Sequence, residues 1–388
     1  MKLYLIAGEP SGDSLGAALM AGLKQLRPDV TFIGIGGPLM QAEGLTSLFP
    51  MDELSVMGLA EVLPRLRHLF RRRNQAVADI LKQIPDALIT IDSPDFCLRV
   101  ARKVKAASDI PTVHYVAPTV WAWRPKRAAK MAGVIDHVLA LFPFEPPYMQ
   151  AAGMTCDFVG HPIVAEPVAD ATDATAFRAT HSIGEAPLVM ILPGSRVGEV
   201  GRLSERFGAA WQIVLGRHPD ARVVVPAAGP VFDIVREQTA RWPGDVLVLD
   251  PNAAEAKVAK RAAFKAADVA LAASGTVSLE LAASGTPMVI AYDMNWLSRR
   301  MIKRMLLIDT VTLVNLVSET RTIPEFLGDR CRPDLIGGTI ADLLQDEAAR
   351  AAQLQACAVT MERLGRGGDA PGLRAARSVL DVISAGEV

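Results

Sequence analysis

Short apolar segments alternate with amphipathic segments along almost the whole chain. The first amphipathic segment carries Leu15, Leu19, Leu23 and Leu26 on one face, and this spacing predicts a helix with one buried side. Strand-length apolar segments that alternate with such helices predict parallel sheets in an α/β fold. We expect strands at residues 3–7, 31–35, 87–91, 112–116, 137–141, 157–159, 188–192, 222–225, 246–249, 269–272 and 288–291. Three further helices are expected at residues 333–344, 347–363 and 372–384.

The chain of 388 residues is long for a single hydrophobic core, so two domains are expected. A polar, proline-flanked stretch at 165–187 separates two series of strands, and we place the connection between the domains there. A glycine-rich joint at 365–372 frees the last helix to dock elsewhere. We therefore expect two doubly wound domains, 1–165 and 166–364, that face a common cleft, and a separate C-terminal segment, 365–388.

The bulk composition argues against several classes of protein. A formal net charge of −1 gives no electrostatic reason to expect nucleic-acid binding. The four cysteines are far apart, as in reduced cytosolic proteins, and the sequence contains no zinc-ligand cluster, HExxH motif or Asp-x-Asp pair. No uncharged apolar run reaches the ~20 residues of a membrane span, and the chain opens on a strand rather than an export signal. We expect a cytoplasmic protein that uses no metal and no cofactor.

The first expected strand runs into a loop with the sequence Gly8-Glu9-Pro10-Ser11-Gly12-Asp13. Its glycines let a ligand approach the backbone closely, and Pro10 pushes Glu9 out of helical geometry and toward the expected cleft. Asp13 or Ser11 can cap the helix that follows. The glycine spacing matches neither the dinucleotide-binding nor the Walker fingerprint, so an ordinary strand-to-helix turn is the alternative interpretation.

Two further loops of the first half carry candidate chemistry. Asp92 is expected at the end of the strand at 87–91, and Asp95 at or near the N-cap of the next helix. Such carboxylates serve equally well as caps or as a general base. The strand at 112–116 leads to a basic segment with two tryptophans, Trp121 to Arg127. Its cations, including Arg124, suit a phosphate and Trp123 suits a sugar or an acyl chain, whereas core tryptophans are the alternative.

The second half contains two loops that suit a diphosphate. Gly194-Ser195-Arg196 supplies a tight turn, a hydroxyl and a planar cation that binds oxygens in pairs. Ser274-Gly275-Thr276 ends a buried strand and opens a helix, where unpaired N–H groups attract phosphate. Glu280 follows one turn later and suits a ribose diol, although a solvated helix position is the alternative.

Basic amphipathic segments at 63–84 and 296–307 combine apolar faces with clustered arginines and lysines. Such helices suit anionic membrane surfaces and phosphorylated lipids. Core-facing helices with solvated polar sides explain either segment alone better, and it is the presence of two such segments in one near-neutral chain that makes membrane binding an equal alternative.

Several of these motifs recur in the order typical of one known family. Taken together they resemble the lipid-A-disaccharide synthases, a family of GT-B glycosyltransferases, over essentially the whole chain. The motifs are residues 8–13, 92–96, 114–116 with 121–124, 159–162, 192–196 and 273–276.

The resemblance implies a GT-B fold with two Rossmann-like domains and an inverting transfer. The implied donor is UDP-2,3-diacylglucosamine and the implied acceptor is 2,3-diacylglucosamine 1-phosphate (lipid X). The product is then a β-1′,6-linked disaccharide 1-phosphate, with UDP released. Inversion requires a single displacement and one general base. The enzyme is expected to bind peripherally to the cytoplasmic leaflet of the inner membrane.

The resemblance also assigns roles to residues of this chain. Asp95 is the expected base, with Asp92 and Glu9 as the other candidates. Arg196 is expected at the diphosphate and Glu280 at the ribose. The C-terminal segment is expected to return to the first domain, and in this family it can exchange between the copies of a homodimer. The remaining donor-binding candidates are Gly194, Ser195, Ser274, Gly275, Thr276 and Asn315. The acceptor-binding candidates are Ser11, Gly12, Asp13, Trp123 and Arg124.

Three other functions remain open at this point. A GT-B transferase with a polyprenyl-linked acceptor shares the donor site and differs in the acceptor alone. A UDP-sugar epimerase interconverts sugars without an acceptor. A lipid- or nucleotide-binding protein without catalysis is disfavoured by the clustered carboxylates.

Overall fold

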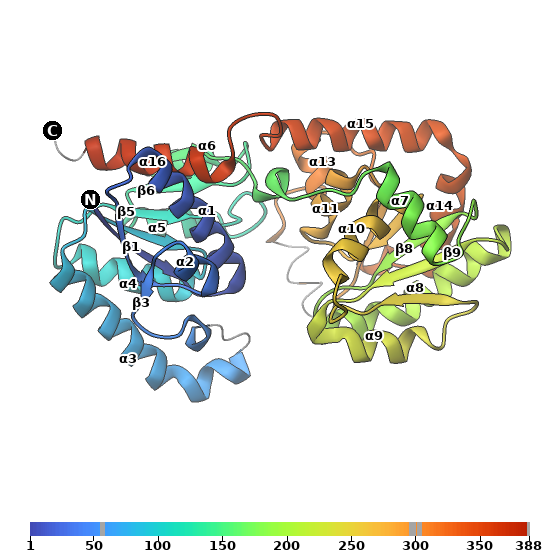
Figure 1. The fold of residues 1–388 in the computed structure, drawn as a ribbon, viewed down its shortest axis with the longest axis horizontal. Coiled ribbons are helices and arrows are strands. Elements are labelled where there is room, and N and C mark those ends of the chain that lie inside the picture. Colours follow the sequence, from blue (N-terminus) through green and yellow to red (C-terminus); the bar gives the residue numbers. More distant parts are fainter. Residues whose placement is uncertain (55–58, 295–299, 301–304, 386–388) are drawn as a thin grey trace. The chain divides into compact units, whose positions relative to one another are not determined.

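The computed structural model describes residues 1–54, 59–294, 300 and 305–385 (Figure 1). The chain divides into two compact units. Unit 1 consists of Met1–Ala165 together with Leu364–Val388, and unit 2 consists of Glu166–Arg363. Each unit contains its own parallel sheet with helices on both faces, so the expected doubly wound α/β class is confirmed.

Across the described residues of unit 1, seven parallel strands form a sheet in the order β3-β2-β1-β4-β5-β6-β7. One face packs against α3, α4 and α5, and the other face against α1 and α16. The strands are β1 (Lys2–Ala7), β2 (Thr31–Ile35), β3 (Thr46–Ser47), β4 (Ala87–Ile91), β5 (Thr112–Tyr115), β6 (His137–Ala140) and β7 (Thr155–Phe158). The α-helices are α1 (Pro10–Leu26), α2 (Pro38–Ala42), α3 (Leu59–Gln83), α4 (Pro94–Lys105), α5 (Lys126–Ala132), α6 (Pro146–Gln150) and α16 (Pro371–Ala385).

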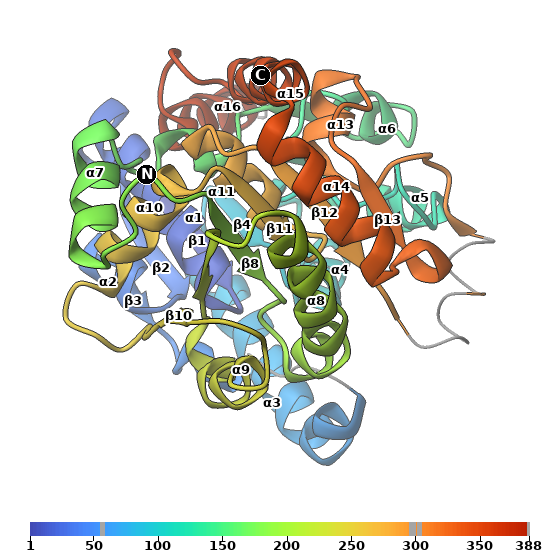
Figure 2. The ribbon, with the colours of Figure 1, turned by 90° about the vertical axis from the view of Figure 1, so that its right-hand side faces the viewer.

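The sheet of unit 2 contains six parallel strands within the described ranges, in the order β10-β9-β8-β11-β12-β13. The helices α8, α9 and α14 cover one face (Figure 2), while α10 and α11 contact the other. The strands are β8 (Leu188–Leu192), β9 (Arg222–Pro226), β10 (Val246–Leu249), β11 (Val269–Ala272), β12 (Met288–Tyr292) and β13 (Glu325–Leu327). The α-helices are α7 (Ala171–Thr180), α8 (Val197–Arg217), α9 (Phe232–Thr239), α10 (Ala256–Ala266), α11 (Val277–Ser284), α13 (Leu313–Ser318), α14 (Pro333–Gln345) and α15 (Glu347–Arg363).

The strands expected from the apolar segments are all present, with small differences at their ends. The strand expected at 112–116 stops at Tyr115 because Val116 has φ +84°, a left-handed conformation that a strand cannot contain. The segment expected at 157–159 is strand Thr155–Phe158. Two edge strands, β3 and β13, were not expected, because one has two residues and the other begins with a glutamate.

The C-terminal helix α16 packs against α1 within unit 1, where the two backbones approach closely (Figure 1). A Cβ at Gly22 would lie 2.6 Å from the carbonyl oxygen of Gly372, so only glycine fits at this crossing. His137 and Ser378 also share a buried hydrogen bond of 2.8 Å between the sheet and α16. Among the described residues, no helix combines the length and the apolar character that crossing a bilayer requires.

Candidate functional site

In both sheets the strand order changes direction beside the first strand of the unit. β1 lies between β2 and β4, and β8 lies between β9 and β11. The ends of these strands are in register, with Ala7 beside Ile91 and Leu192 beside Ala272. The loops after β1 and β4 therefore emerge side by side, as do the loops after β8 and β11. Open α/β sheets bind ligands at such switch points, beyond the carboxyl ends of the strands.

In unit 1 the two loops at the switch point pack directly on one another. The backbone of Gly8 is so close to Ser93 that a Cβ at position 8 would overlap Ser93 Oγ and lie 2.9 Å from its Cβ. This contact brings the carboxyl groups of Glu9 and Asp92 into hydrogen-bond contact. The hydroxyl of Ser11 also donates to Glu9, at 2.7 Å. The structure thus brings together three of the sequence-predicted site residues.

Asp92 carries the strongest electrostatic perturbation in this cluster. Burial, together with the hydrogen bond to Glu9 and repulsion by that second carboxyl, raises the pKa of Asp92 to about 6. Asp92 and Ser93 have φ values of +49° and +44°, and Val116 after the neighbouring strand has +84°. Such backbone strain at adjacent strand ends is typical of functional sites.

Asp13 does not cap its own helix, and this expectation is wrong. The side chain is 2% exposed and accepts hydrogen bonds from the N–H groups of Gly37 (2.9 Å), Leu39 (3.0 Å) and Met40 (3.0 Å). It therefore caps α2 and ties the loop after β2 to α1. Ser11 does not cap α1 either, because its hydroxyl donates to Glu9, the N-cap residue.

Asp95 lies in the first turn of α4, where its side chain is exposed and Ser93 is the N-cap residue. A carboxylate here is favoured by the positive end of the helix dipole. Gly12 is buried in α1 against Ile91, where a Cβ would lie 3.4 Å from the Ile91 carbonyl oxygen. Its role is therefore close packing of α1 against the end of β4.

The two tryptophans after β5 occupy different environments. Trp121 is buried and donates a hydrogen bond of 3.2 Å from Nε1 to Glu145, so the core interpretation holds for it. Trp123 is half-buried, and the exposed guanidinium of Arg124 stacks over its ring at 4.3 Å. Glu145 was not identified from the sequence. It is 2% exposed, and burial raises its pKa to about 7.

In unit 2, the turn after β8 is built around a residue that the sequence analysis missed. Gly194 has φ +118°, and Arg196 is the N-cap residue of α8, with its side chain 70% exposed. Glu199 accepts hydrogen bonds from Ser195 N (3.3 Å) and Arg196 Nη1 (3.0 Å), and Tyr292 OH lies 3.4 Å away. The spacing of three from Arg196 to Glu199 on a helix is the signal that could have identified this partner.

The turn after β11 presents an exposed backbone. Gly275 has φ +156°, its carbonyl oxygen accepts from Ser278 Oγ at 2.8 Å, and Thr276 is the N-cap residue of α11. Ser274 is half-buried beside them. Glu280 is paired with Lys260 of α10, with 2.6 Å between Nζ and Oε2, and both side chains remain partly exposed.

Asn315 lies in α13 and is 1% exposed. Its Nδ2 donates to Ile323 O (3.0 Å) and Thr310 Oγ1 (3.3 Å), and its Oδ1 accepts from Ile323 N (3.1 Å). The amide therefore fastens the chain on either side of α13, and in this conformation it is occupied by protein groups.

The basic segment at 63–84 lies in α3 as far as Gln83, and Ile84 follows the helix with a φ of +46°. Arg67 and Arg71 are exposed, and Phe70 is 40% exposed. Arg72 instead makes two 2.6 Å hydrogen bonds to Glu53 and holds the pKa of that carboxyl at about 2. The second basic segment, 296–307, falls mostly outside the described residues.

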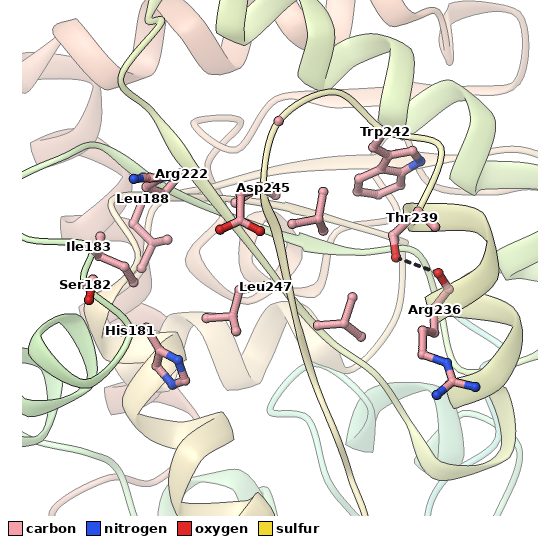
Figure 3. A pocket seen from close by; sticks show the side chains of 15 residues that line it. His181, Ser182, Ile183, Leu188, Arg222, Arg236, Thr239, Trp242, Asp245 and Leu247 are labelled. Carbon is pink, nitrogen blue, oxygen red and sulfur yellow. Dashed lines mark hydrogen bonds between the residues drawn. The ribbon is translucent and has the colours of Figure 1, made fainter.

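A cavity of about 560 Å³ lies elsewhere in unit 2, around the edge strand β10 (Figure 3). His181 and Asp245 lie on one side of the strand, and Trp242 and Arg236 lie on the other. The cavity also contacts Leu188 and Arg222, the first residues of β8 and β9. It therefore lies at the amino-terminal ends of these strands, whereas the switch-point loops follow their carboxyl ends. Among the described residues, no group of three His, Cys, Asp or Glu side chains forms a candidate metal site.

Comparison with solved structures supports the fold. The chain is similar to a Staphylococcus aureus MnaA–UDP co-structure, with a TM-score of 0.66, 14% identity and coverage of 100% of this chain and 97% of the other. It is also similar to Acinetobacter baumannii MurG, with a TM-score of 0.57, 14% identity and 99% coverage of both chains. The expected GT-B fold with two Rossmann-like domains is confirmed.

Comparison with protein sequences identifies the family. The model of the family described as lipid-A-disaccharide synthetase matches residues 3–367. The chain is 62% identical to the lipid-A-disaccharide synthase of Ruegeria pomeroyi over 384 residues, which cover 98% of this chain and 95% of the relative. It is 46% identical to the synthase of Rhodospirillum centenum, with 99% and 95% covered. The chain therefore belongs to the lipid-A-disaccharide synthetase family and is a glycosyltransferase of lipid A disaccharide synthesis.

Proposed function

We propose that the enzyme transfers 2,3-diacylglucosamine from UDP to the 6-hydroxyl of 2,3-diacylglucosamine 1-phosphate (lipid X). The products are the β-1′,6-linked disaccharide 1-phosphate and UDP. Family membership supports the lipid A disaccharide product. The single structural observation that carries the donor assignment is the pair of turns after β8 and β11, which meet at the switch point of unit 2.

The donor binds to unit 2 in this proposal. Arg196 neutralises the diphosphate, and the starts of α8 and α11 direct N–H groups and the positive ends of their dipoles toward it. The turn residues Gly194, Ser195, Ser274, Gly275 and Thr276 let the phosphates approach the backbone. Glu280 accepts from the ribose hydroxyls and Lys260 holds its carboxylate in place. Asn315 acts indirectly, by fastening the segment around α13.

The acceptor binds to unit 1. Arg124, supported by Trp123, and the loop with Ser11 are the candidate contacts for its sugar and 1-phosphate. Gly12 and Asp13 shape that loop from inside the fold. Asp95 is the proposed general base, because its exposed carboxylate at the start of α4 is available to a hydroxyl. The Glu9–Asp92 pair is the alternative base.

The reaction is one displacement with inversion. The base accepts the proton of the acceptor 6-hydroxyl as O6 attacks C1 of the donor sugar from the face opposite UDP. The bond from C1 to the diphosphate oxygen breaks as the new C1–O6 bond forms, and its electron pair leaves with UDP. Arg196 and the helix starts stabilise the charge that develops on the leaving diphosphate.

We also propose that the enzyme binds peripherally to the cytoplasmic leaflet of the inner membrane, because both of its substrates carry acyl chains. The exposed Arg67, Arg71 and Phe70 of α3 suit an anionic lipid surface. We also propose that two copies associate by exchanging α16, since each copy offers the same contacts to this helix. The molar mass measured by light scattering distinguishes a monomer from a homodimer.

The purified protein incubated with UDP-2,3-diacylglucosamine, lipid X and EDTA tests the proposal. Mass spectrometry should detect the disaccharide 1-phosphate and an equal amount of UDP. A parallel reaction with a polyprenyl-linked acceptor should yield no product. Conversion of the donor sugar without any acceptor would point to epimerase chemistry instead, and UDP binding without product would move the proposal to another acceptor.

A further inference from the structure

Glu199 lies directly beneath the turn that follows β8, and its side chain is 13% exposed. Its Oε2 accepts from the backbone N–H of Ser195 at 3.3 Å, and its Oε1 accepts from Arg196 Nη1 at 3.0 Å. Tyr292, the last residue of β12, donates its hydroxyl to the same Oε1 at 3.4 Å. One carboxylate therefore engages the N–H and the guanidinium of the turn at the same time.

The backbone of the turn is shaped to this carboxylate. A Cβ at position 194 would lie 2.7 Å from Glu199 Oε2 and 2.8 Å from its Cβ, and Gly194 has φ +118°. Both the conformation and the close approach require glycine. The turn is therefore folded around an anion that belongs to the chain itself.

The groups that Glu199 engages are those a diphosphate would use. A backbone N–H before a helix and a planar guanidinium are the common donors to phosphate oxygens. We propose that Glu199 is a placeholder for the donor's diphosphate: it holds Ser195 and Arg196 in the ligand-free enzyme, and the diphosphate displaces it from both. This inference rests on the proposed donor site in unit 2.

The proposal makes Glu199 a positioning residue that acts through Arg196. Its negative charge competes with the ligand for the same guanidinium, so removing the charge releases Arg196 and strengthens binding. The Arg196 side chain is 70% exposed, so the competing ion pair is weak and the gain is modest. A residue with a purely structural role would give the opposite result, because losing it would disorder the turn and weaken binding.

Calorimetric titration with UDP and with inorganic diphosphate tests the proposal. Glu199→Gln should tighten the binding of both by about three- to tenfold, since it keeps the shape of the side chain and removes the charge. Glu199→Asp keeps the charge but shortens the reach to Ser195 and Arg196, and it should tighten binding by a smaller factor. Glu205→Gln removes an equal charge from an exposed position of the same helix and should leave UDP affinity unchanged.

A double variant separates this inference from the donor-site proposal. In the background of Arg196→Ala, the gain from Glu199→Gln should shrink to the part that comes from the Ser195 N–H, because the competition for the guanidinium is gone. If Arg196→Ala alone leaves UDP affinity unchanged, the proposed donor site is wrong. If Arg196→Ala weakens UDP binding but the folded Glu199 variants bind UDP equally well or more weakly than the wild type, the placeholder role alone is overturned.

Discussion

Gly8 and Ser93 are in such close contact that a methyl group on Gly8 would overlap the Ser93 hydroxyl oxygen. The contact joins the loop after β1 to the loop after β4, and it determines where Glu9 and Asp92 meet. The contact between Gly8 and Ser93 therefore shapes the candidate acceptor site as well as the fold.

Gly8→Ala should separate these two loops. We expect a loss of about 1–3 kcal/mol in the free energy of unfolding from overpacking, and at least a ~10-fold lower turnover from the displaced carboxylates. Ser93→Gly removes both overlapping atoms and suits the φ of +44° at that position, so the double variant should recover most of both losses.

The control for this prediction is Gly133→Ala at the C-cap of α5. Among the described residues, no heavy atom beyond its own chain neighbours and the adjacent helix backbone lies within 4 Å of the added methyl, so stability and turnover should hardly change. Chemical denaturation and the product assay measure the two quantities. A Gly8→Ala enzyme with normal turnover would show that the packing of the two loops does not position the reacting groups.

The identity of the general base can be read from variants and pH. Asp95→Asn should lower turnover by ~10²-fold or more and leave UDP affinity unchanged. Asp92→Asn should reduce turnover less. If instead Asp92 is the base, the turnover of the wild type should decrease as the pH drops below the Asp92 pKa of about 6. Asp92→Asn should then abolish the turnover that requires the ionised Asp92 carboxylate. The profile of kcat against pH in all three proteins decides between the two assignments.

Asp92 should also make stability depend on pH, and the sign follows from its raised pKa. The folded protein keeps this proton up to a pH of about 6, while the unfolded chain loses it near the ordinary value of 3.8. Relative to Asp92→Asn, the wild type should therefore lose stability as the pH rises through this window. We expect the variant to unfold ~2–4 °C higher than the wild type at pH 8, with no such gain at pH 4, in calorimetric scans. An equal difference at both pH values would contradict a buried, protonated Asp92.

Glu280 should distinguish a ribose from a deoxyribose. In the proposed donor site it accepts from the ribose hydroxyls, so the wild type should bind UDP at least ~5-fold more tightly than 2′-deoxy-UDP. Glu280→Ala should erase that preference. Lys260→Met removes only the partner of Glu280 and serves as the control, since it should retain a preference for the ribose. If Glu280→Ala still prefers UDP to 2′-deoxy-UDP, Glu280 does not bind the ribose and is only the partner of Lys260 in a surface ion pair.

The sequence was sufficient for the parts of the molecule that depend on local pattern. Apolar runs located the long strands, and glycine with a small polar residue located the switch-point turns. The sequence was insufficient where a side chain forms a hydrogen bond with a distant segment. Asp13 reaches α2, 24 to 27 residues away, and Lys260 reaches Glu280 from another helix. Such contacts depend on how elements pack, which periodicity does not encode. Glu199 is intermediate, because helical spacing links it to Arg196 but its contact with Tyr292 is tertiary.

The exposed basic side of α3 should control binding to anionic vesicles. Arg67→Glu with Arg71→Glu reverses two exposed charges and leaves the Arg72–Glu53 pair intact, so the helix should stay anchored. We expect the variant to lose at least ~10-fold in sedimentation with vesicles that contain phosphatidylglycerol, since each basic residue near such a surface contributes about 1 kcal/mol. Raising the salt concentration should also weaken the binding of the wild type to these vesicles.

Arg236→Glu with Arg241→Glu makes the same charge change on exposed arginines of unit 2, and should retain more vesicle binding. Equal losses in the two double variants would mean that overall charge, rather than α3, attracts the membrane, and an unaffected α3 variant would leave apolar contact as the cause.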